Sequence, residues 1–129
     1  MSENVIVRNE NTVEWNKSSE LPGLRWKYLV DSTEAQSHGL STGVLEIATG
    51  AELPLHHHSP QEIYLIRKGE GLRLKKDGET QPVRPDDVIY IPEGEQHGLR
   101  NTGDTPLEFL WIFPTDCWQE VAYIFAQEK

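Results

Sequence analysis

The sequence is divided into short runs rich in β-branched and aromatic residues, separated by glycine, proline, aspartate and asparagine. Six of these runs predict strands, at residues 23–30, 39–48, 62–68, 70–76, 87–91 and 107–113. No stretch sustains an apolar period of 3.6 residues over ten positions, so the only helical turn expected is a short one near 115–121. Many short strands at this spacing favour one all-β domain, built as an antiparallel sandwich or barrel.

Length and composition narrow the class of protein. A chain of 129 residues is about one domain. Its formal net charge of −9 argues against a nucleic-acid partner, because nucleic-acid-binding proteins present a basic face. No apolar run reaches the roughly 18 residues of a membrane span, and residues 1–15 lack the pattern of a secretory signal. Cys117 is the one cysteine, which excludes an internal disulfide, and we expect a cytoplasmic protein with no membrane partner.

Three consecutive histidines, at positions 56–58, precede Glu62 and Tyr64. Side chains alternate between the two faces of a strand, so His56 and His58 point to one face and His57 to the other. Glu62 and Tyr64 likewise share one face of the next run. If the two strands are neighbours, two imidazoles and a carboxylate converge. Nitrogen and oxygen ligands without a thiolate suit divalent Fe, Mn, Ni, Co or Zn.

A further ligand has to come from one of the two remaining histidines. His38 lies in a polar stretch and is expected to be an ordinary surface residue. His97 lies just after the run at 87–91 and a Pro-x-Gly turn. His97 is therefore the better candidate for the metal site.

These residues fit the two sequence motifs of the cupin superfamily. The first motif, G-x5-H-x-H-x3-E-x6-G, matches at every position across residues 50–69. The second, P-x-G-x2-H-x3-N, matches across residues 92–101. Asp86 replaces the glycine that normally opens this second segment, 86–101. Aspartate is one of the few residues that tolerate the positive φ of a tight turn, so the departure is small.

The resemblance implies a fold, a cofactor and a partner. Residues 1–129 would form a single-domain cupin, a small antiparallel β-barrel or jelly roll. One divalent transition metal would be held by four ligands, namely His56, His58, Glu62 and His97. Cupin domains of this size often pair through sheet edges, so a homodimer is expected. Trp118 and the apolar residues of the N-terminal arm are candidates for that contact.

The segments 21–31, 56–66, 107–116 and 120–125 resemble the small cupin lyases of dimethylsulfoniopropionate (DMSP). This resemblance implies a metal-dependent carbon–sulfur lyase with a small carboxylate substrate. Such an enzyme removes the proton α to the carboxylate and expels dimethyl sulfide, leaving acrylate. Tyr64 shares a face with Glu62, and the lyases have their proposed catalytic tyrosine at this place. Tyr123 matches a second site tyrosine of these enzymes.

Two predicted strands carry aromatic residues on one face. In 107–113 this face includes Phe109 and Trp111, and in 23–30 it includes Trp26 and Tyr28. If both faces line the interior, these four residues can bind the sulfonium cation, since a cation over an aromatic ring gains roughly 0.5–2 kcal/mol. The alternative is that the rings only fill the core.

Two other functions remain open. One is a different metal-dependent cupin enzyme, an Fe(II) dioxygenase or an isomerase, acting on a small carboxylate. The other is a non-catalytic cupin binding module. Oxygen consumption separates the dioxygenase from the lyase. Loss of turnover on chelation separates the enzymes from the binding module.

Overall fold

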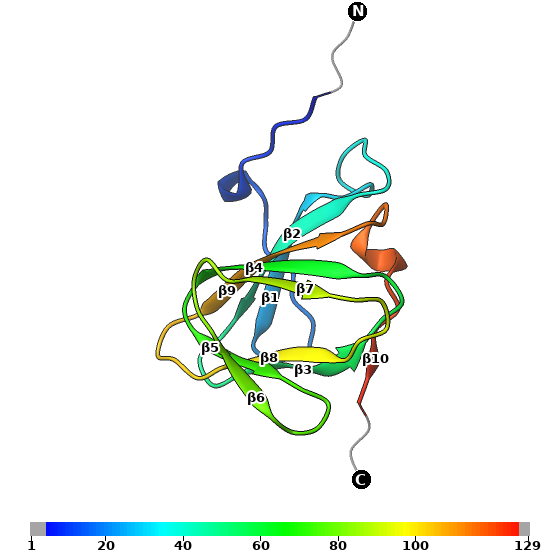
Figure 1. The fold of residues 1–129 in the computed structure, drawn as a ribbon. Coiled ribbons are helices and arrows are strands. Elements are labelled where there is room, and N and C mark those ends of the chain that lie inside the picture. The colour runs from blue at the N-terminus through cyan, green and yellow to red at the C-terminus, as the bar shows by residue number, and fades with distance from the viewer. Residues whose placement is uncertain (1–4, 127–129) are drawn as a thin grey trace, which may run out of the picture.

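The computed structural model describes residues 5–126, so the ends of the predicted domain, 1–4 and 127–129, lie outside the described residues. Ten strands form two antiparallel five-stranded sheets that face each other (Figure 1). One sheet has the order β1-β2-β9-β4-β7 and comprises Leu24–Val30, Ser41–Ile47, Leu107–Phe113, Glu62–Lys68 and Val88–Ile91. The other has the order β10-β3-β8-β5-β6 and comprises Ile124–Phe125, Glu52–His57, His97–Asn101, Gly71–Leu74 and Thr80–Val83. The predicted all-β class is confirmed.

The six predicted runs overlap strands β1, β2, β4, β5, β7 and β9. None of the six runs covers β3, β6, β8 or β10, although a strand was assumed at His56–His58 for the alternation of the histidines. Strand β8 has the sequence HGLRN, which has little intrinsic strand preference, and it forms because β3 and β5 pair with it on either side. Strand β6 contains Pro82 and lies at a sheet edge, where proline is tolerated. The short turn expected near 115–121 is a 3-10 helix at Trp118–Glu120, and a second one spans Glu10–Thr12.

The aromatic face of β9 lies in the interior, which is the condition that the expected cation site set for this strand. Phe109 and Trp111 are 1% and 3% exposed, and Leu107 and Phe113 are fully buried. On β1 the burial is uneven, because Trp26 is buried and Tyr28 is only partly covered. The interior of the β1-β2-β9-β4-β7 sheet is therefore lined by aromatic rings together with aliphatic side chains.

Gly43 makes room for one of these rings. In the register of the sheet, Tyr28, Gly43, Trp111 and Tyr64 form one row across β1, β2, β9 and β4. A Cβ at position 43 would overlap the six-membered ring of Trp111 and the carbonyl oxygen of Lys27. The Trp111 indole thus lies against the bare backbone of β2, in a place that only glycine leaves free.

Asp86 has the backbone conformation that its place in the second motif requires. Its φ is 76°, and it is the one non-glycine residue with positive φ in the described part of the chain. Its N–H donates to the carbonyl of Ile66 at 2.8 Å, which ties the turn before β7 to β4. The substitution of aspartate for glycine therefore leaves the turn intact.

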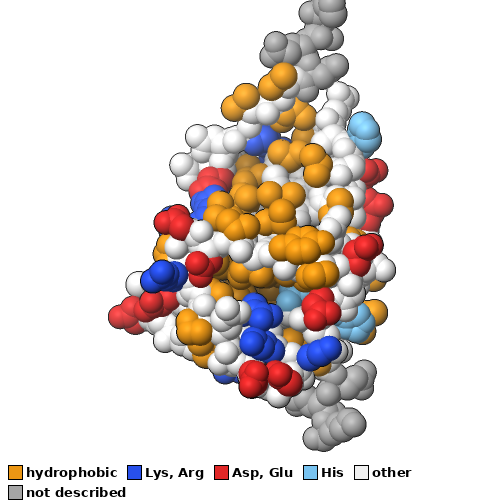
Figure 2. Space-filling view, viewed as in Figure 1, with side chains coloured by type: hydrophobic (Ala, Val, Ile, Leu, Met, Phe, Trp, Pro, Cys, Tyr) orange, Lys and Arg blue, Asp and Glu red, His pale blue; other side chains and the backbone are white. Residues whose placement is uncertain are grey.

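Apolar side chains gather on the outer face of the sheet that holds β4 and β7 (Figure 2). Ile63, Val88 and Tyr90 are exposed on this face by 37%, 65% and 59%. Strand β7 is also the terminal strand of its sheet, so one of its edges has no neighbouring strand among residues 5–126. Within residues 5–126, the structure has no helix with the length and apolar character needed to cross a membrane.

Candidate metal centre

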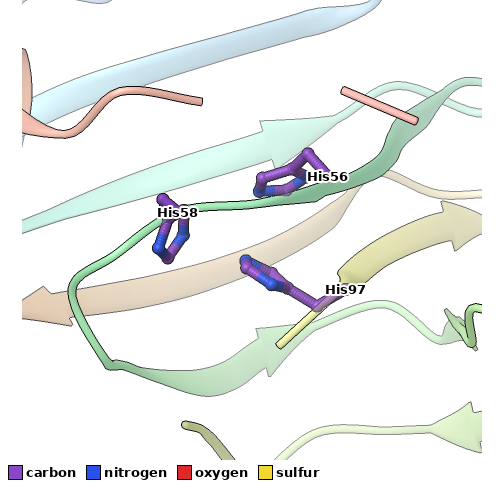
Figure 3. Close-up of side chains that lie close together, drawn as sticks. All are labelled: His56, His58 and His97. Atoms are coloured by element: carbon purple, nitrogen blue, oxygen red, sulfur yellow. The ribbon is translucent and has the colours of Figure 1, made fainter. Parts of the chain in front are cut away.

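Three histidines converge between the two sheets (Figure 3). His56 lies in β3, His58 follows the end of that strand, and His97 begins β8 opposite His56. One ligand atom from each lies within 4.8 Å of the others, and all three side chains are buried. His57 points to the other side of β3 and is partly exposed, while His38 is exposed. The alternation predicted for residues 56–58 and the choice of His97 over His38 agree with this cluster.

The hydrogen bonds of the imidazoles determine which nitrogen carries the proton. The Nδ1 atom of each ring lies within 2.7–2.9 Å of a backbone carbonyl, His56 with Pro54, His58 with Pro60 and His97 with Glu95. A carbonyl can only accept, so each Nδ1 donates its N–H. In a neutral imidazole the other nitrogen, Nε2, then presents a lone pair. This second contact to a carbonyl is the usual way in which a protein orients a metal-binding histidine.

The centre has unpaired acceptors that a cation would satisfy. Burial, and then the proximity of His97, lowers the pKa of His56 from 6.5 to about 3, so His56 is neutral at pH 7. The Nε2 atoms of His56 and His97 are buried without a hydrogen-bond partner in the part of the chain that the structure describes. Buried lone pairs without a partner are costly. The three-histidine centre therefore fits one divalent metal ion.

Glu62 lies beside the histidines, on β4. The expected pairing of its strand with the strand of His56 is wrong, because β3 and β4 belong to opposite sheets and Glu62 meets the histidines across the interior. It is 2% exposed, and its Oε1 is 3.2 Å from Nε2 of His58 and 3.4 Å from Nε2 of His97. With the protons on the Nδ1 atoms, these contacts join two acceptors and are unfavourable unless a cation lies between them. The donor set of imidazole nitrogen and carboxylate oxygen, with no sulfur, suits a divalent first-row transition metal. Glu62 as the fourth ligand stays a prediction.

The candidate catalytic and substrate residues meet at a small internal cavity next to Glu62. Its volume is about 10 Å³, close to that of one water. Its wall consists of Trp26, Leu45, Leu53, Glu62, Tyr64, Phe109, Trp111, Trp118 and Tyr123. Tyr28, which the sequence also singled out, lies outside this wall. Its hydroxyl accepts a hydrogen bond from Trp26 Nε1 at 3.0 Å, and its ring packs edge-on against Trp111.

Both candidate catalytic tyrosines are held in their protonated form. Burial raises the pKa of Tyr64 well above 10, and the adjacent Glu62 carboxylate raises it further. Burial also raises the pKa of Tyr123 well above 10, again with a contribution from Glu62. A cation bound by the cluster would offset the charge of Glu62 and so weaken one of these causes.

From the C-terminal segment 117–126 the sequence singled out Tyr123 for the site, but it suggested Trp118 only as a dimer contact and missed the place of Trp118 in the cavity wall. Trp118 packs against Trp26 with ring centroids 5.3 Å apart, and its indole N–H donates to the hydroxyl of Tyr123 at 2.8 Å. Tyr123 in turn stacks on His56, with centroids 4.6 Å apart and an interplanar angle of 8°. Strand β10 then pairs with β3 at His56 and His57. The short turn predicted near 115–121 was the available signal, but it did not indicate an inward-facing tryptophan.

A surface groove lies on the other side of this aromatic wall. It has a volume of about 540 Å³ and is lined by Ser18, Glu20, Leu21, Trp26, Trp118, Gln119, Val121, Tyr123 and Phe125. Trp26, Trp118 and Tyr123 line both the groove and the internal cavity. Three aromatic side chains therefore stand between the groove and the cavity beside the metal centre.

Comparisons with known proteins agree with the fold and the centre. The sequence profile of the family described as "Cupin domain" matches residues 43–113. A dimethylsulfoniopropionate lyase of Ruegeria pomeroyi, DddW, is 31% identical over 103 residues, which are 80% of this chain and 66% of the relative. An oxalate-binding protein of Thermotoga maritima is 39% identical over 69 residues, 53% of this chain and 56% of the relative. The chain thus spans less than two thirds of the length of these curated relatives.

Among solved structures, the polyketide cyclase RemF of Streptomyces resistomycificus superposes with a TM-score of 0.81. The match covers 100% of this chain and 88% of RemF at 20% sequence identity. At this level of identity the likeness concerns the fold alone.

Proposed function

Because this chain belongs to the cupin family, we propose that it is a metal-dependent carbon–sulfur lyase that cleaves DMSP into acrylate and dimethyl sulfide. The observation that carries the proposal is the placement of Tyr64, Glu62 and the aromatic side chains around one internal cavity beside the three-histidine centre. The 31% identity with a DMSP lyase over 80% of this chain supports the same substrate. The relative is longer than this chain, so its activity is proposed here and not transferred.

The side chains of the cavity can divide the work of a β-elimination. A divalent ion held by His56, His58, Glu62 and His97 would act as a Lewis acid for a carboxylate. Tyr64 is proposed as the base that takes the α-proton in its phenolate form, which a divalent ion bound at the centre would favour against the burial and the Glu62 charge that raise its pKa. The electron pair of that C–H bond forms the C=C bond of acrylate, and the electrons of the C–S bond leave with dimethyl sulfide. Tyr123, which accepts a hydrogen bond from Trp118 in the wall of the cavity, is proposed as a second catalytic group.

The aromatic residues suit the cationic end of this substrate. Trp26, Phe109 and Trp111 line the cavity, and each can present a ring to a sulfonium. Tyr28 does not line the cavity, and we propose that it contributes to substrate binding by positioning Trp26, whose indole N–H donates to its hydroxyl. The cavity of about 10 Å³ is too small for DMSP as it stands. We therefore expect Trp118 and Tyr123 to move when the substrate passes from the surface groove into the cavity.

An anaerobic headspace assay tests the proposed function. Metal-loaded protein is incubated with DMSP, and dimethyl sulfide and acrylate are measured together. The lyase releases the two products in equal amounts without oxygen, and a chelator stops the reaction. The matched control is His56→Ala, which removes a metal ligand and should abolish the release of both products.

Other outcomes of this assay point to the alternatives. Turnover of a small carboxylate only in the presence of oxygen would indicate a dioxygenase. Binding of a small carboxylate without any turnover would indicate a binding module, which the similarity to an oxalate-binding protein also suggests. Absence of dimethyl sulfide from fully metal-loaded protein contradicts the proposed reaction.

A homodimer is proposed as the assembly. The exposed apolar side chains Ile63, Val88 and Tyr90, together with the free edge of β7, support a contact with a second copy of this chain. A stable interface buries about 800 Å² on each partner, roughly a tenth of the 8101 Å² surface of the chain. Light scattering of the parent and of Val88→Lys tests this, since the lysine would disrupt a contact through β7. A parent that stays monomeric contradicts the proposal.

A further inference from the structure

The three tryptophans of the internal cavity differ in one respect. The indole N–H of Trp26 donates to the hydroxyl of Tyr28 at 3.0 Å, and that of Trp118 donates to the hydroxyl of Tyr123 at 2.8 Å. Trp111 is 3% exposed, and its Nε1 is buried with no hydrogen-bond partner among residues 5–126. A buried indole N–H normally finds a partner, because an unpaired buried donor loses its contact with water and gains nothing in return.

The Trp111 ring is packed between its neighbours Gly43 and Tyr28. Its six-membered ring lies against Gly43 on β2, where a Cβ would already overlap it. On β4, the register partner of Trp111 is Tyr64, two residues after Glu62. The unpaired donor therefore belongs to a fixed side chain in the wall of the cavity, on the strand next to the one that carries Glu62 and Tyr64.

The chemistry around this donor selects its acceptor. The cavity is lined mainly by aromatic rings and aliphatic side chains, and a metal centre at its edge would attract a negatively charged oxygen. A carboxylate has two oxygens, so one can face the metal centre while the other accepts from a neighbouring N–H. Hydrogen bonds to a charged acceptor are stronger than those between neutral groups.

We propose that the Trp111 indole N–H donates a hydrogen bond to the carboxylate of the bound small molecule and makes the site selective for carboxylates over neutral amides. The proposal deepens the proposed function, on which it rests for the carboxylate end of the substrate. It differs from a cation–π role, because it uses the edge of the indole and leaves the ring face for the sulfonium. A carboxylate and a sulfonium two carbons apart can contact the same large ring.

Nuclear magnetic resonance of ¹⁵N-labelled, Zn(II)-loaded protein tests the hydrogen bond directly. The probes are sodium propionate, which has the carboxylate but no leaving group, and propionamide as its neutral match. The Trp111 indole signal is assigned from its nuclear Overhauser effect to Gly43, which the ring covers. We expect propionate to move the Trp111 indole proton downfield and propionamide to leave it in place. An unmoved signal at saturating propionate, an equal response to propionamide, or no binding of propionate overturns the proposal.

A matched pair of variants measures the selectivity. Trp111→Phe removes the unpaired N–H and keeps an aromatic ring, whereas Trp118→Phe removes an N–H that Tyr123 already accepts. The ratio of propionate to propionamide affinity should fall about tenfold or more in Trp111→Phe and less than threefold in Trp118→Phe, since a hydrogen bond to a charged group is lost only in the first. Equal ratios in the two variants contradict the proposal. If Trp111→Phe does not fold, the response of the Trp111 indole signal to propionate and propionamide in the parent protein tests the proposal without the variant.

These tests can fail independently of the lyase assay. A protein that releases no dimethyl sulfide but shows the propionate-dependent indole shift lacks the proposed reaction and keeps the carboxylate site. A protein that releases dimethyl sulfide while the Trp111 indole stays unmoved has the reaction and lacks this hydrogen bond.

Discussion

Acid should destabilise the metal-free protein through His56. The unfolded chain protonates this imidazole near pH 6.5, whereas burial and the neighbouring His97 lower its pKa in the folded protein to about 3. Between these values the unfolded state binds more protons than the folded state, so the free energy of unfolding falls as the pH falls. At pH 4.5, two units below 6.5, His56 alone should lower it by about 2.7 kcal/mol relative to pH 7.5, at about 1.36 kcal/mol per unit.

Urea unfolding in the presence of a chelator measures this effect. The parent and His56→Gln are compared at pH 7.5 and 4.5, because groups remote from His56 also titrate in this range and their contributions cancel in the comparison. The drop in unfolding free energy should be about 2.7 kcal/mol larger in the parent than in His56→Gln. The matched control is His57→Gln, which removes an imidazole from the outer side of the same strand. Equal drops in the parent and in His56→Gln, within about 0.5 kcal/mol, refute the reasoning.

Other substitutions test the centre and its support. Alanine at His56 or His58 should remove the metal, while His57→Ala should leave the metal content nearly unchanged because the His57 side chain faces away from the cluster. Elemental analysis measures the metal content, and an equal loss in all three variants is incompatible with this geometry. Gly43→Ala should lower the unfolding free energy by about 3 kcal/mol, at the upper end for an overpacked core, because the new Cβ overlaps both Trp111 and the backbone of Lys27. A melting temperature equal to that of the parent contradicts that packing.

The sequence predicted the centre better than its surroundings. His56, His58 and His97 were identified because strand alternation and motif spacing constrain ligands on two segments, and both constraints are local. Strand β8, which carries His97, was not predicted, because its five residues take their conformation from pairing with β3 and β5. A metal ligand such as His97 can thus be recognised from the sequence even where the secondary structure of its segment cannot be predicted.

The way in which Trp118 covers the internal cavity was not predictable from the local sequence pattern. Trp118 lies inward because its backbone N–H donates to Asp31, 87 residues earlier, and its indole to Tyr123. The unpaired N–H of Trp111 depends likewise on Gly43, its register partner on another strand. Such long-range contacts leave no periodic signal in the sequence, so the volume of the cavity and the role of Trp118 required the structure.

The central claim is that Tyr64, beside the histidine centre, removes the α-proton. Turnover of DMSP by Tyr64→Phe, at the same metal occupancy as the parent, tests it most directly. The substitution keeps the ring and its packing against Phe109 and removes only the hydroxyl. We expect a loss of at least about a hundredfold, roughly 2.7 kcal/mol of activation free energy, with metal content and melting temperature close to those of the parent. Turnover within threefold of the parent would contradict the claim, and Tyr123 would then be the next base to test.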